Sequence, residues 1–320
     1  MRIEELKVNK KLKIVFMGTP AFSVPVLEGL LQNYKLRAIV TQPDRKGKDG
    51  EMIPPPVKKI GMEHTILVLQ PEKISEAVEE ILSLQPDLII TCAYGQIIPK
   101  EILDYPRLGC INVHPSLLPK LRGGAPIHRA IINGYTKTGV SIIYMNEKMD
   151  EGDIISQREI EITDTDTAST LHDKLSILSR DLLLETLPAI ISETAPRVRQ
   201  NFREATYAPI ITREDEKLDF SKSRKEIYNK VRGLNSWPGA YCIFEGKILK
   251  VWECYISDRY FSENFNGQIT GIYEDGIGVK VSNGEVVLTV VQPEGKKKMR
   301  AIEFVNGVNN KESIVGKVLS

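Results

Sequence analysis

The stretch Asn112-Val113-His114-Pro115-Ser116-Leu117-Leu118-Pro119 follows an apolar run, Gly109-Cys110-Ile111, that predicts the end of a buried strand. Residues two apart on a strand point to the same face, so Asn112 and His114 are expected to face one point in space. In open α/β sheets, ligands bind beyond the carboxyl ends of the strands. The stretch therefore predicts a functional site. The alternative, from these residues alone, is an Asn that caps a turn and a His that fills a gap.

Apolar runs alternate with amphipathic stretches on both sides of this motif, which predicts a doubly wound, Rossmann-like, mostly parallel α/β sheet. The predicted strands are 12–17, 36–40, 66–69, 87–92, 109–111, 138–145 and 154–162, and the predicted helices follow Gly18-Thr19-Pro20 and cover 72–84, 126–133 and 167–192. Gly18 lacks the second and third glycines of a dinucleotide-binding turn, so we expect the fold without the nucleotide.

The pattern changes in the last third of the chain. Ser223 and Glu226 have the spacing of a capping box and predict a helix through Val231. Short β-rich runs then predict a small OB-like β-barrel, with strands at 240–244, 248–255, 267–273, 276–281 and 286–291. We therefore expect an N-terminal extension (1–11), a catalytic domain (12–195), a linker (196–218) and a C-terminal barrel domain (219–320).

Composition excludes several classes of protein. The formal net charge of the 320-residue chain is +1, so a polyanionic partner must be bound by local basic patches. No apolar run approaches the roughly 20 residues that span a bilayer, and residues 1–11 lack the apolar stretch of a signal peptide, so we expect a cytoplasmic protein. The four cysteines form no C-x-x-C pair; Cys92 and Cys110 read as core residues, and no metal is expected.

Charged segments and the remaining histidines leave alternatives open. The loop after Thr41 carries Arg45, Lys46 and Lys48, and a later segment carries Lys296, Lys297 and Lys298; each is either a solvated surface or a contact for phosphates. The turn at 146–153 does not fit a calcium loop, and one of its carboxylates could instead hold an imidazole. We expect His64 on the surface and structural roles for His128 and His172.

Three motifs together resemble the folate-dependent formyltransferases: the opening stretch, Arg122-Gly123-Gly124-Ala125-Pro126-Ile127, and Met149-Asp150-Glu151-Gly152-Asp153-Ile154. An Asn, a His and an Asp form the active site of that family, and the matching residues are Asn112, His114 and Asp150. The resemblance also implies a folate site formed by Ser116, Leu117, Leu118, Pro119, Tyr94 and Gly95.

Further segments resemble the members of this family that act on the initiator tRNA: Thr41-Gln42-Pro43-Asp44-Arg45, Ala93-Tyr94-Gly95 and Gln292-Pro293-x-Gly295-Lys296-Lys297. The resemblance implies transfer of the formyl group of 10-formyltetrahydrofolate to the α-amino group of methionyl-initiator tRNA, without a metal. It also implies tRNA contacts at the six basic residues named above. We expect a monomer.

In that reaction the amine attacks the formyl carbon and a tetrahedral oxyanion forms. The Asn112 amide and the His114 imidazolium would donate hydrogen bonds to the oxyanion, and Asp150 would orient the ring and help to collect the amine proton. Alternatives are a formyltransferase acting on a sugar-nucleotide amine, a hydrolase of the formyl donor, and a nucleic-acid binder without activity. A glycinamide ribonucleotide enzyme would end near residue 200, and residues 220–320 argue against it.

Overall fold

The computed structural model describes residues 12–263, 265–307 and 311–320. The predicted N-terminal extension, residues 1–11, lies outside the described residues. The chain forms two compact units: the first continues to residue 126 and includes 138–160 and 172–208, and the second contains 127–137, 161–171 and 209–320. The domain boundaries that composition suggests stay a prediction.

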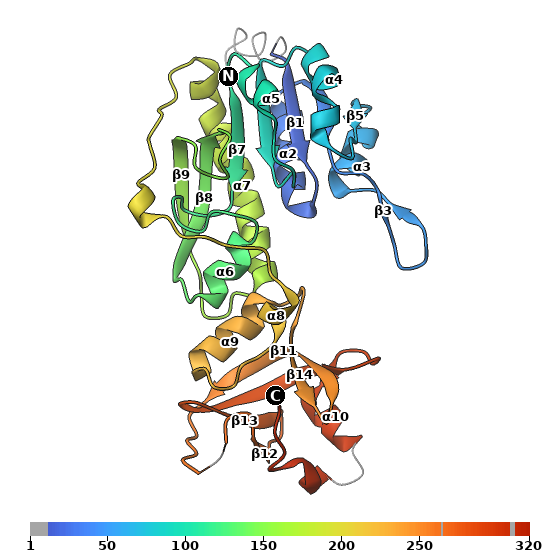
Figure 1. The fold of residues 1–320 in the computed structure, drawn as a ribbon, viewed down its shortest axis with the longest axis vertical. Coiled ribbons are helices and arrows are strands. Elements are labelled where there is room, and N and C mark those ends of the chain that lie inside the picture. Colours follow the sequence, from blue (N-terminus) through green and yellow to red (C-terminus); the bar gives the residue numbers. More distant parts are fainter. Residues whose placement is uncertain (1–11, 264, 308–310) are drawn as a thin grey trace. The chain divides into compact units, whose positions relative to one another are not determined.

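The first unit is built on a seven-stranded sheet with the strand order β5-β2-β1-β6-β7-β8-β9 (Figure 1). The strands are β1 (Ile14–Gly18), β2 (Leu36–Val40), β5 (Val68–Leu69), β6 (Leu88–Cys92), β7 (Cys110–His114), β8 (Lys137–Tyr144) and β9 (Ile154–Glu161). The pairs from β5 to β7 are parallel, and β8 runs antiparallel to β7. The prediction of a mostly parallel sheet is confirmed.

The central strands β1 and β6 are buried along their whole length, as their continuous apolar sequences predict. Gly18, at the end of β1, lies close against β6: a Cβ atom there would be 3.0 Å from the carbonyl oxygen of Cys92. The close approach of two strands therefore explains this glycine, and no phosphate is needed to account for it.

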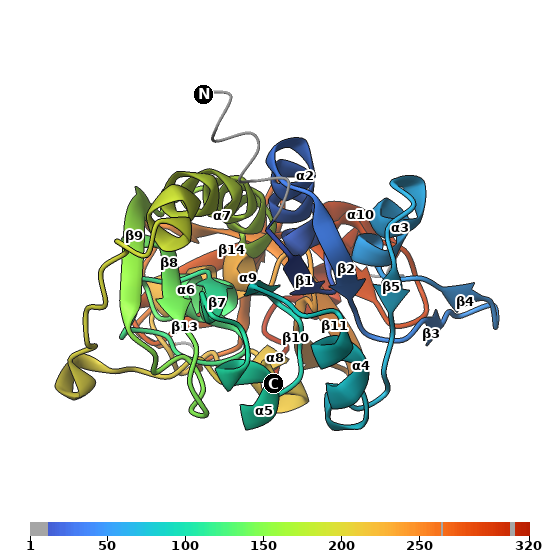
Figure 2. The ribbon, with the colours of Figure 1, turned by 90° about the horizontal axis from the view of Figure 1, so that it is seen from above.

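Helices cover both faces of the sheet, which makes it doubly wound (Figure 2). α2 (Val24–Asn33) and α7 (Ala168–Ile191) lie on one face, and α4 (Val78–Ser83) and α5 (Lys100–Asp104) lie on the other. α3 (Pro56–Glu63) packs beside α2, and α6 (Pro126–Ile132) precedes β8. Below α4 and α5, an apolar cluster joins side chains of β1, β2 and β6 to Ile81 and Ile102.

The strand order reverses between β1 and β6, because the chain passes from β1 to β2 and β5 and then returns to the other side of β1. Ligands of open α/β sheets bind beyond the carboxyl ends of the strands at such a reversal. Side chains tie the strand ends together here: Thr19 and Gln42 both donate to the carbonyl oxygen of Tyr94, at 3.0 and 3.1 Å. β7 pairs with β6, so its end lies beside this reversal.

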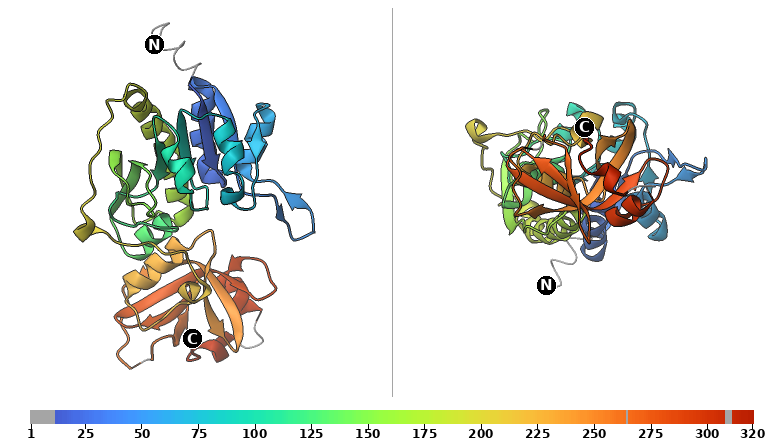
Figure 3. Two further views of the ribbon diagram at one scale, coloured as in Figure 1. Left: turned by 45° about the horizontal axis from the view of Figure 1, so that its top comes forward. Right: turned by 90° about the horizontal axis from the view of Figure 1, so that it is seen from below.

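The second unit contains a six-stranded antiparallel sheet (Figure 3). Its strands, in spatial order, are β10 (Ala240–Phe244), β11 (Lys247–Ser257), β14 (Gly284–Pro293), β13 (Ile277–Val281) and β12 (Ile269–Ile272), with β15 (Met299–Arg300) paired to β14. β13 and β14 form a hairpin in which Val281 pairs with Gly284, across the turn of Ser282 and Asn283. The predicted capping box is also present: the Ser223 side chain accepts a bond from the Glu226 amide at the start of α9 (Arg224–Gly233).

Residues 317–320 join the two outer strands of this sheet. The main chain of Ser320 exchanges two hydrogen bonds with Ile243 of β10, at 2.6 and 3.0 Å. In the same segment, Ile269 of β12 donates to the Lys317 carbonyl at 2.8 Å, and Leu319 donates to the Gly267 carbonyl at 2.8 Å. The segment thus bridges the free edges of β10 and β12 and closes the sheet into the predicted barrel.

Several stretches differ from the sequence prediction. The predicted helix 72–84 is wrong in extent: a 3-10 turn (Ile74–Glu76) precedes the short α4, and Ala77 between them leaves the helical conformation, with φ = −108° and ψ = 14°. The loop after Thr41 contains a small hairpin, β3 (Arg45–Lys46) and β4 (Met52–Ile53), and α3 begins at Pro56, where no amide proton is needed. The elements not predicted at all include η1 (Ala21–Ser23), α5, η3 (Phe202–Glu204), α8 (Arg213–Glu216), α10 (Ala301–Asn306) and η4 (Lys311–Ile314).

Candidate active site

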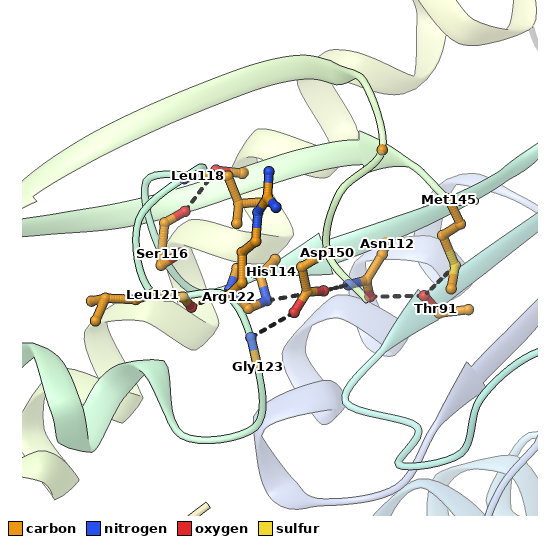
Figure 4. A network of polar contacts seen from close by, with 12 residues as sticks. Thr91, Asn112, His114, Ser116, Leu118, Leu121, Arg122, Gly123, Met145 and Asp150 are labelled. Atoms are coloured by element: carbon orange, nitrogen blue, oxygen red, sulfur yellow. Dashed lines mark hydrogen bonds and ion pairs between the residues drawn. The ribbon is translucent and has the colours of Figure 1, made fainter. Parts of the chain in front are cut away.

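Three side chains that are far apart in the sequence meet at the end of β7 (Figure 4). Asn112 and His114 stand on β7 itself, and Asp150 comes from the turn that joins β8 to β9. The His114 residue is 4% exposed, and Asn112 and Asp150 are partly buried. The predicted convergence of Asn112, His114 and Asp150 is what the structure shows.

The two oxygens of Asp150 have different partners. Oδ1 lies 3.4 Å from Nδ2 of Asn112, which donates to it, and 3.6 Å from Nδ1 of His114. Oδ2 accepts a hydrogen bond of 2.8 Å from the main-chain amide of Gly123. One oxygen is therefore held by the backbone, and the other faces the amide and the imidazole together.

The imidazole of His114 lies between two oxygen atoms. Its Nε2 is 3.0 Å from the carbonyl oxygen of Leu121, and its Nδ1 faces Asp150. Only the doubly protonated ring can donate from both nitrogens. Because a carbonyl oxygen only accepts, Nε2 carries a proton, and Nδ1 is the ring nitrogen on the side of Asp150.

The amide of Asn112 is oriented by its neighbour on β6. The Thr91 hydroxyl donates to Oδ1 of Asn112 at 2.7 Å, and the same hydroxyl lies 3.2 Å from the sulfur of Met145. With its oxygen engaged in this way, the amide presents its NH₂ group toward Asp150. Asn112 is therefore available as a donor on the side where the three residues meet.

The turn that carries Asp150 has a restricted backbone. Asp150 has φ = 55°, in the left-handed region, which Asp and Asn tolerate better than most residues. Two residues later, a Cβ atom on Gly152 would lie 1.6 Å from the carbonyl oxygen of Tyr144, so only glycine fits there. The turn is packed against the end of β8, and this packing fixes where the carboxylate points.

The predicted folate segment, Ser116 to Pro119, is held by hydrogen bonds to its main chain. Ser141 donates to the Ser116 carbonyl at 2.6 Å and accepts from the Leu118 amide at 3.0 Å, and Gln157 donates to the Leu118 carbonyl at 2.9 Å. The Ser116 hydroxyl is buried and donates to the Lys120 carbonyl at 2.7 Å. Leu118 is also buried, so the partly exposed side chains of this segment are those of Leu117 and Pro119.

The remaining predicted folate residues, Tyr94 and Gly95, follow β6. The Tyr94 ring packs in the apolar cluster under α4 and α5, and burial raises the pKa of its phenol to about 12. Gly95 is exposed and has φ = 91°. Burial likewise raises the pKa of the Cys92 thiol to about 12, so this cysteine is no thiolate nucleophile at neutral pH.

The predicted tRNA residues lie on two exposed segments, one in each unit. Arg45, Lys46 and Lys48 are on the β3–β4 hairpin, whose base is held by an ion pair of 2.8 Å between Asp44 and Lys58. Hydrogen bonds from Gln70 and Lys58 lower the pKa of Asp44.

The second segment, Lys296 to Lys298, connects β14 to β15 and is exposed. The Lys298 ammonium lies 3.4 Å from the ring centroid of Trp252, and the Trp252 indole donates to Gln292 at 3.0 Å. Gln292 in turn donates to the Lys296 carbonyl at 2.9 Å. The loop is thus anchored at both ends, while its ammonium groups remain at the surface.

The other histidines contact neighbouring residues away from the three converging side chains. His128 bonds the Gly233 carbonyl at 2.8 Å, His172 packs edge-on against Phe22, and His64 is exposed at the end of α3. Within the described residues, no three His, Cys, Asp or Glu side chains are grouped so as to hold a metal ion. Across the same residues, no helix combines the length and the apolar character required to cross a membrane.

Residues 12–187 match the formyl transferase family, and residues 210–309 match the C-terminal domain of formyl transferases. A methionyl-tRNA formyltransferase of Bacillus velezensis is 51% identical over 304 residues, which cover 93% of this chain and 95% of the relative. The methionyl-tRNA formyltransferase of Bacillus subtilis is 50% identical over 303 residues, with the same coverage of 93% and 95%.

The chain belongs to the methionyl-tRNA formyltransferases. It is therefore an enzyme that transfers a formyl group, and the resemblance noted in the sequence is confirmed. The identity extends through both units, so the C-terminal barrel is part of what this chain shares with the family.

Solved structures with lower identity share the fold. An N-formyltransferase from Helicobacter canadensis, in complex with folinic acid and dTDP-3-aminofucose, gives a TM-score of 0.67 at 20% identity over 87% of this chain and 98% of that one. HypX from Aquifex aeolicus, in complex with tetrahydrofolic acid, gives 0.64 at 18% identity over 92% of this chain. This chain spans about half of HypX, 48% of its length.

Sequence reasoning overlooked several residues that the methionyl-tRNA formyltransferase fold brings to the site. Thr91 orients Asn112 but reads in the sequence as one more residue of a buried strand. Arg122 and Gly123 lie in the motif at residues 122–127, but the motif does not indicate that the Gly123 amide bonds the Asp150 carboxylate. Gln200 lies in the predicted linker, and no local pattern signals that it contacts the Asp150 turn.

Proposed function

We propose that this enzyme transfers the formyl group of 10-formyltetrahydrofolate to the α-amino group of methionyl-initiator tRNA, which yields N-formylmethionyl-tRNA for translation initiation. The observation that carries the chemistry is the position of Asp150 Oδ1, within 3.6 Å of both the Asn112 amide and the His114 ring. The acceptor is argued from the relatives. They are methionyl-tRNA formyltransferases, and the match to this chain covers 95% of their own length.

Two donors stabilise the negative charge of the tetrahedral intermediate in this proposal. Nδ2 of Asn112 is oriented by Thr91, and Nδ1 of His114 is the ring nitrogen on the same side, because Nε2 is engaged by Leu121. Donors fixed before the reaction stabilise a developing oxyanion without reorganising. The buried position of His114 strengthens the effect, because water is kept away from the charge.

Asp150 has the role of an orienting carboxylate. Its Oδ1 compensates the positive charge of the His114 ring, as a carboxylate does in a Ser–His–Asp triad. When the amine attacks, its nitrogen becomes positively charged and must lose a proton. Asp150 accepts that proton, because the doubly protonated His114 ring has no free lone pair, and the nitrogen that leaves as the bond to the formyl carbon breaks takes a proton back.

The formyl donor would bind beside Ser116 to Pro119 and the loop at Tyr94 and Gly95. Leu117 and Pro119 supply partly exposed apolar surface, and the hydrogen bonds of Ser141 and Gln157 keep the main chain in place. Two solved proteins of the same fold were crystallised with folinic acid and with tetrahydrofolic acid, which supports a folate here. The donor enters as a second substrate, and no step of this proposal uses a metal.

The tRNA would be bound through its phosphates by Arg45, Lys46 and Lys48 on the hairpin and by Lys296, Lys297 and Lys298 on the barrel. All six side chains are exposed and cationic at neutral pH, which suits contacts to a polyanion. With a net charge of only +1 on the chain, such local clusters must supply the attraction. The monomeric state and the cytoplasmic location stay predictions.

The alternative is a formyltransferase that acts on a sugar-nucleotide amine, because a solved protein of this fold was crystallised with an aminosugar nucleotide. An acceptor test separates the two. Purified enzyme is given the formyl donor with initiator Met-tRNA, elongator Met-tRNA or a UDP-amino-sugar, and the formylated product is identified by mass. We expect formylation of initiator Met-tRNA. Formylation of the sugar nucleotide alone would contradict the proposal.

A further inference from the structure

Gln200 uses its whole side-chain amide to hold the turn that carries Asp150. Its Nε2 donates to the carbonyl oxygens of Asp150 and Gly152, both at 2.8 Å. Its Oε1 accepts from Nε and Nη2 of Arg122, at 3.2 and 2.7 Å. Gln200 is 4% exposed, so these four bonds replace those that water would otherwise make.

Arg122, the other half of this contact, is 1% exposed. Its Nη1 lies 3.0 Å from Glu151 Oε1, in the same turn, and its guanidinium carbon lies 5.0 Å from the Phe202 ring centroid. Its main-chain amide donates to Thr206 at 2.9 Å. Arg122 is also adjacent to Gly123, the residue whose amide bonds Oδ2 of Asp150. Both ends of the turn are thereby linked to the loop that follows β7.

We propose that Gln200 is a positioning residue for the formyl transfer: it holds the Asp150 turn in its left-handed conformation and so keeps Oδ1 beside Asn112 and His114. This inference rests on the proposed function, because it assigns Gln200 a task only if Asp150 takes part in the reaction. Gln200 itself bonds no part of Asn112 or His114 among the contacts of the described residues. Its effect on the reaction therefore passes through Asp150.

The physical argument depends on what the turn loses without Gln200. The carbonyl oxygens of Asp150 and Gly152 would lose their buried donor, and an unsatisfied buried group favours any conformation that restores a bond. Asp150, at φ = 55°, would then relax toward ordinary backbone angles. A shift of about 1 Å in a reacting group can cost about 100-fold in rate.

The test compares Gln200→Ala and Gln200→Glu with wild type. Glutamate keeps the acceptor for Arg122 but cannot donate to the two carbonyl oxygens, so it isolates the contact with the turn. We expect both variants to lose about 10- to 100-fold in kcat, with the KM values for the formyl donor and for Met-tRNA nearly unchanged. Gln268→Ala is the matched control. The Gln268 side chain also bonds two main-chain groups, since it accepts from the Phe265 amide and donates to the Gly316 carbonyl, and its loss should leave kcat unchanged.

A double variant separates this inference from the proposed function. In an Asp150→Asn background, which is already slow, Gln200→Ala should lower kcat no further, because the residue acts through Asp150. Additive losses, a wild-type kcat in Gln200→Ala and Gln200→Glu, or a loss of kcat that only follows a loss of folded protein in unfolding curves would each overturn the inference. A wild-type kcat in Asp150→Asn would instead overturn the assignment of Asp150.

Discussion

The end of β7 and the loop from Lys296 to Lys298 are both polar, but they are built in opposite ways. At the end of β7, the side chains of Asn112, His114 and Asp150 are wholly or partly buried, and their polar atoms have partners between 2.7 and 3.6 Å away. In the loop, the main chain is anchored by Gln292, but the ammonium groups are exposed. One region fixes positions, and the other provides charge.

This difference predicts two kinds of sensitivity. A site that stabilises a transition state depends on distances, so the loss of a single donor has a large effect on the rate. A surface that attracts a polyanion depends on the number of charges, so each change has a modest effect that varies with salt. The following variants test whether the two regions really differ in this way.

The largest effects are expected at the end of β7. Asn112→Ala, His114→Ala and Asp150→Ala should each lower kcat by about 100- to 1,000-fold, because the first two remove donors to the oxyanion and the third removes the carboxylate that orients the His114 ring and accepts the amine proton. Steady-state kinetics with both substrates measures this, and binding of the formyl donor should persist. Asn146→Ala, in the same loop as Asp150 but exposed, is the matched control. Near-normal turnover in His114→Ala would contradict the assignment of this region.

Smaller effects are expected when the charges of the loop are removed. With Lys296, Lys297 and Lys298 all changed to Gln, KM for tRNA should rise, and the slope of log KM against log salt should flatten by about 2 to 3 units. kcat should change little. The same loss of three charges at Lys35, Arg37 and Lys59, which are also exposed, is the control. Equal effects of the two triple variants would mean that only net charge matters.

The smallest effect concerns a cation that another side chain has already neutralised. Arg129 bonds Asp215 with both terminal nitrogens, at 3.1 and 2.7 Å, and this bonding lowers the pKa of Asp215 to about 2. A carboxyl with a lowered pKa contributes stability above its unfolded value of 3.8, and the contribution disappears as the pH falls toward 2.

Asp215→Asn should therefore lower the free energy of unfolding by about 1 kcal/mol at neutral pH, since the pair is partly exposed to solvent. The difference from wild type should shrink between about pH 5 and about pH 2. Chemical denaturation across this range measures it, and the salt dependence of KM for tRNA should stay as in wild type. A change in the slope of log KM for tRNA against log salt would instead indicate that Arg129 and Asp215 belong to the surface that binds tRNA.

Much of the fold follows from local sequence. The apolar runs of β1 and β6 predict central strands, and the spacing of Ser223 and Glu226 predicts the start of α9. The pair Asn112 and His114 is predictable because β7 places alternate residues on one face. Asp150 could be added only through the resemblance to a family, since no local rule joins residue 150 to residue 114.

What the sequence does not reveal depends on long-range contacts. The helix expected at 72–84 is interrupted at Ala77, and the turn before it is held by Gln96, on a different loop, which bonds the Ile74 amide and the Glu72 carbonyl. Gln200 and Thr91 are ordinary residues by composition, and their roles come from what the fold places next to them. Buried hydrogen bonds between distant segments therefore mark the limit of reading this chain by pattern.

The closure of the barrel has a practical consequence for handling the enzyme. Residues 317–320 are hydrogen-bonded to both Ile243 and Gly267. An affinity tag fused directly behind Ser320 would therefore be attached to the segment that closes the barrel. Loss of this segment would free the edges of two strands at once and expose them to pairing with other molecules. Tags and labels for binding experiments are better attached through a spacer, so that the hydrogen bonds of residues 317–320 stay intact.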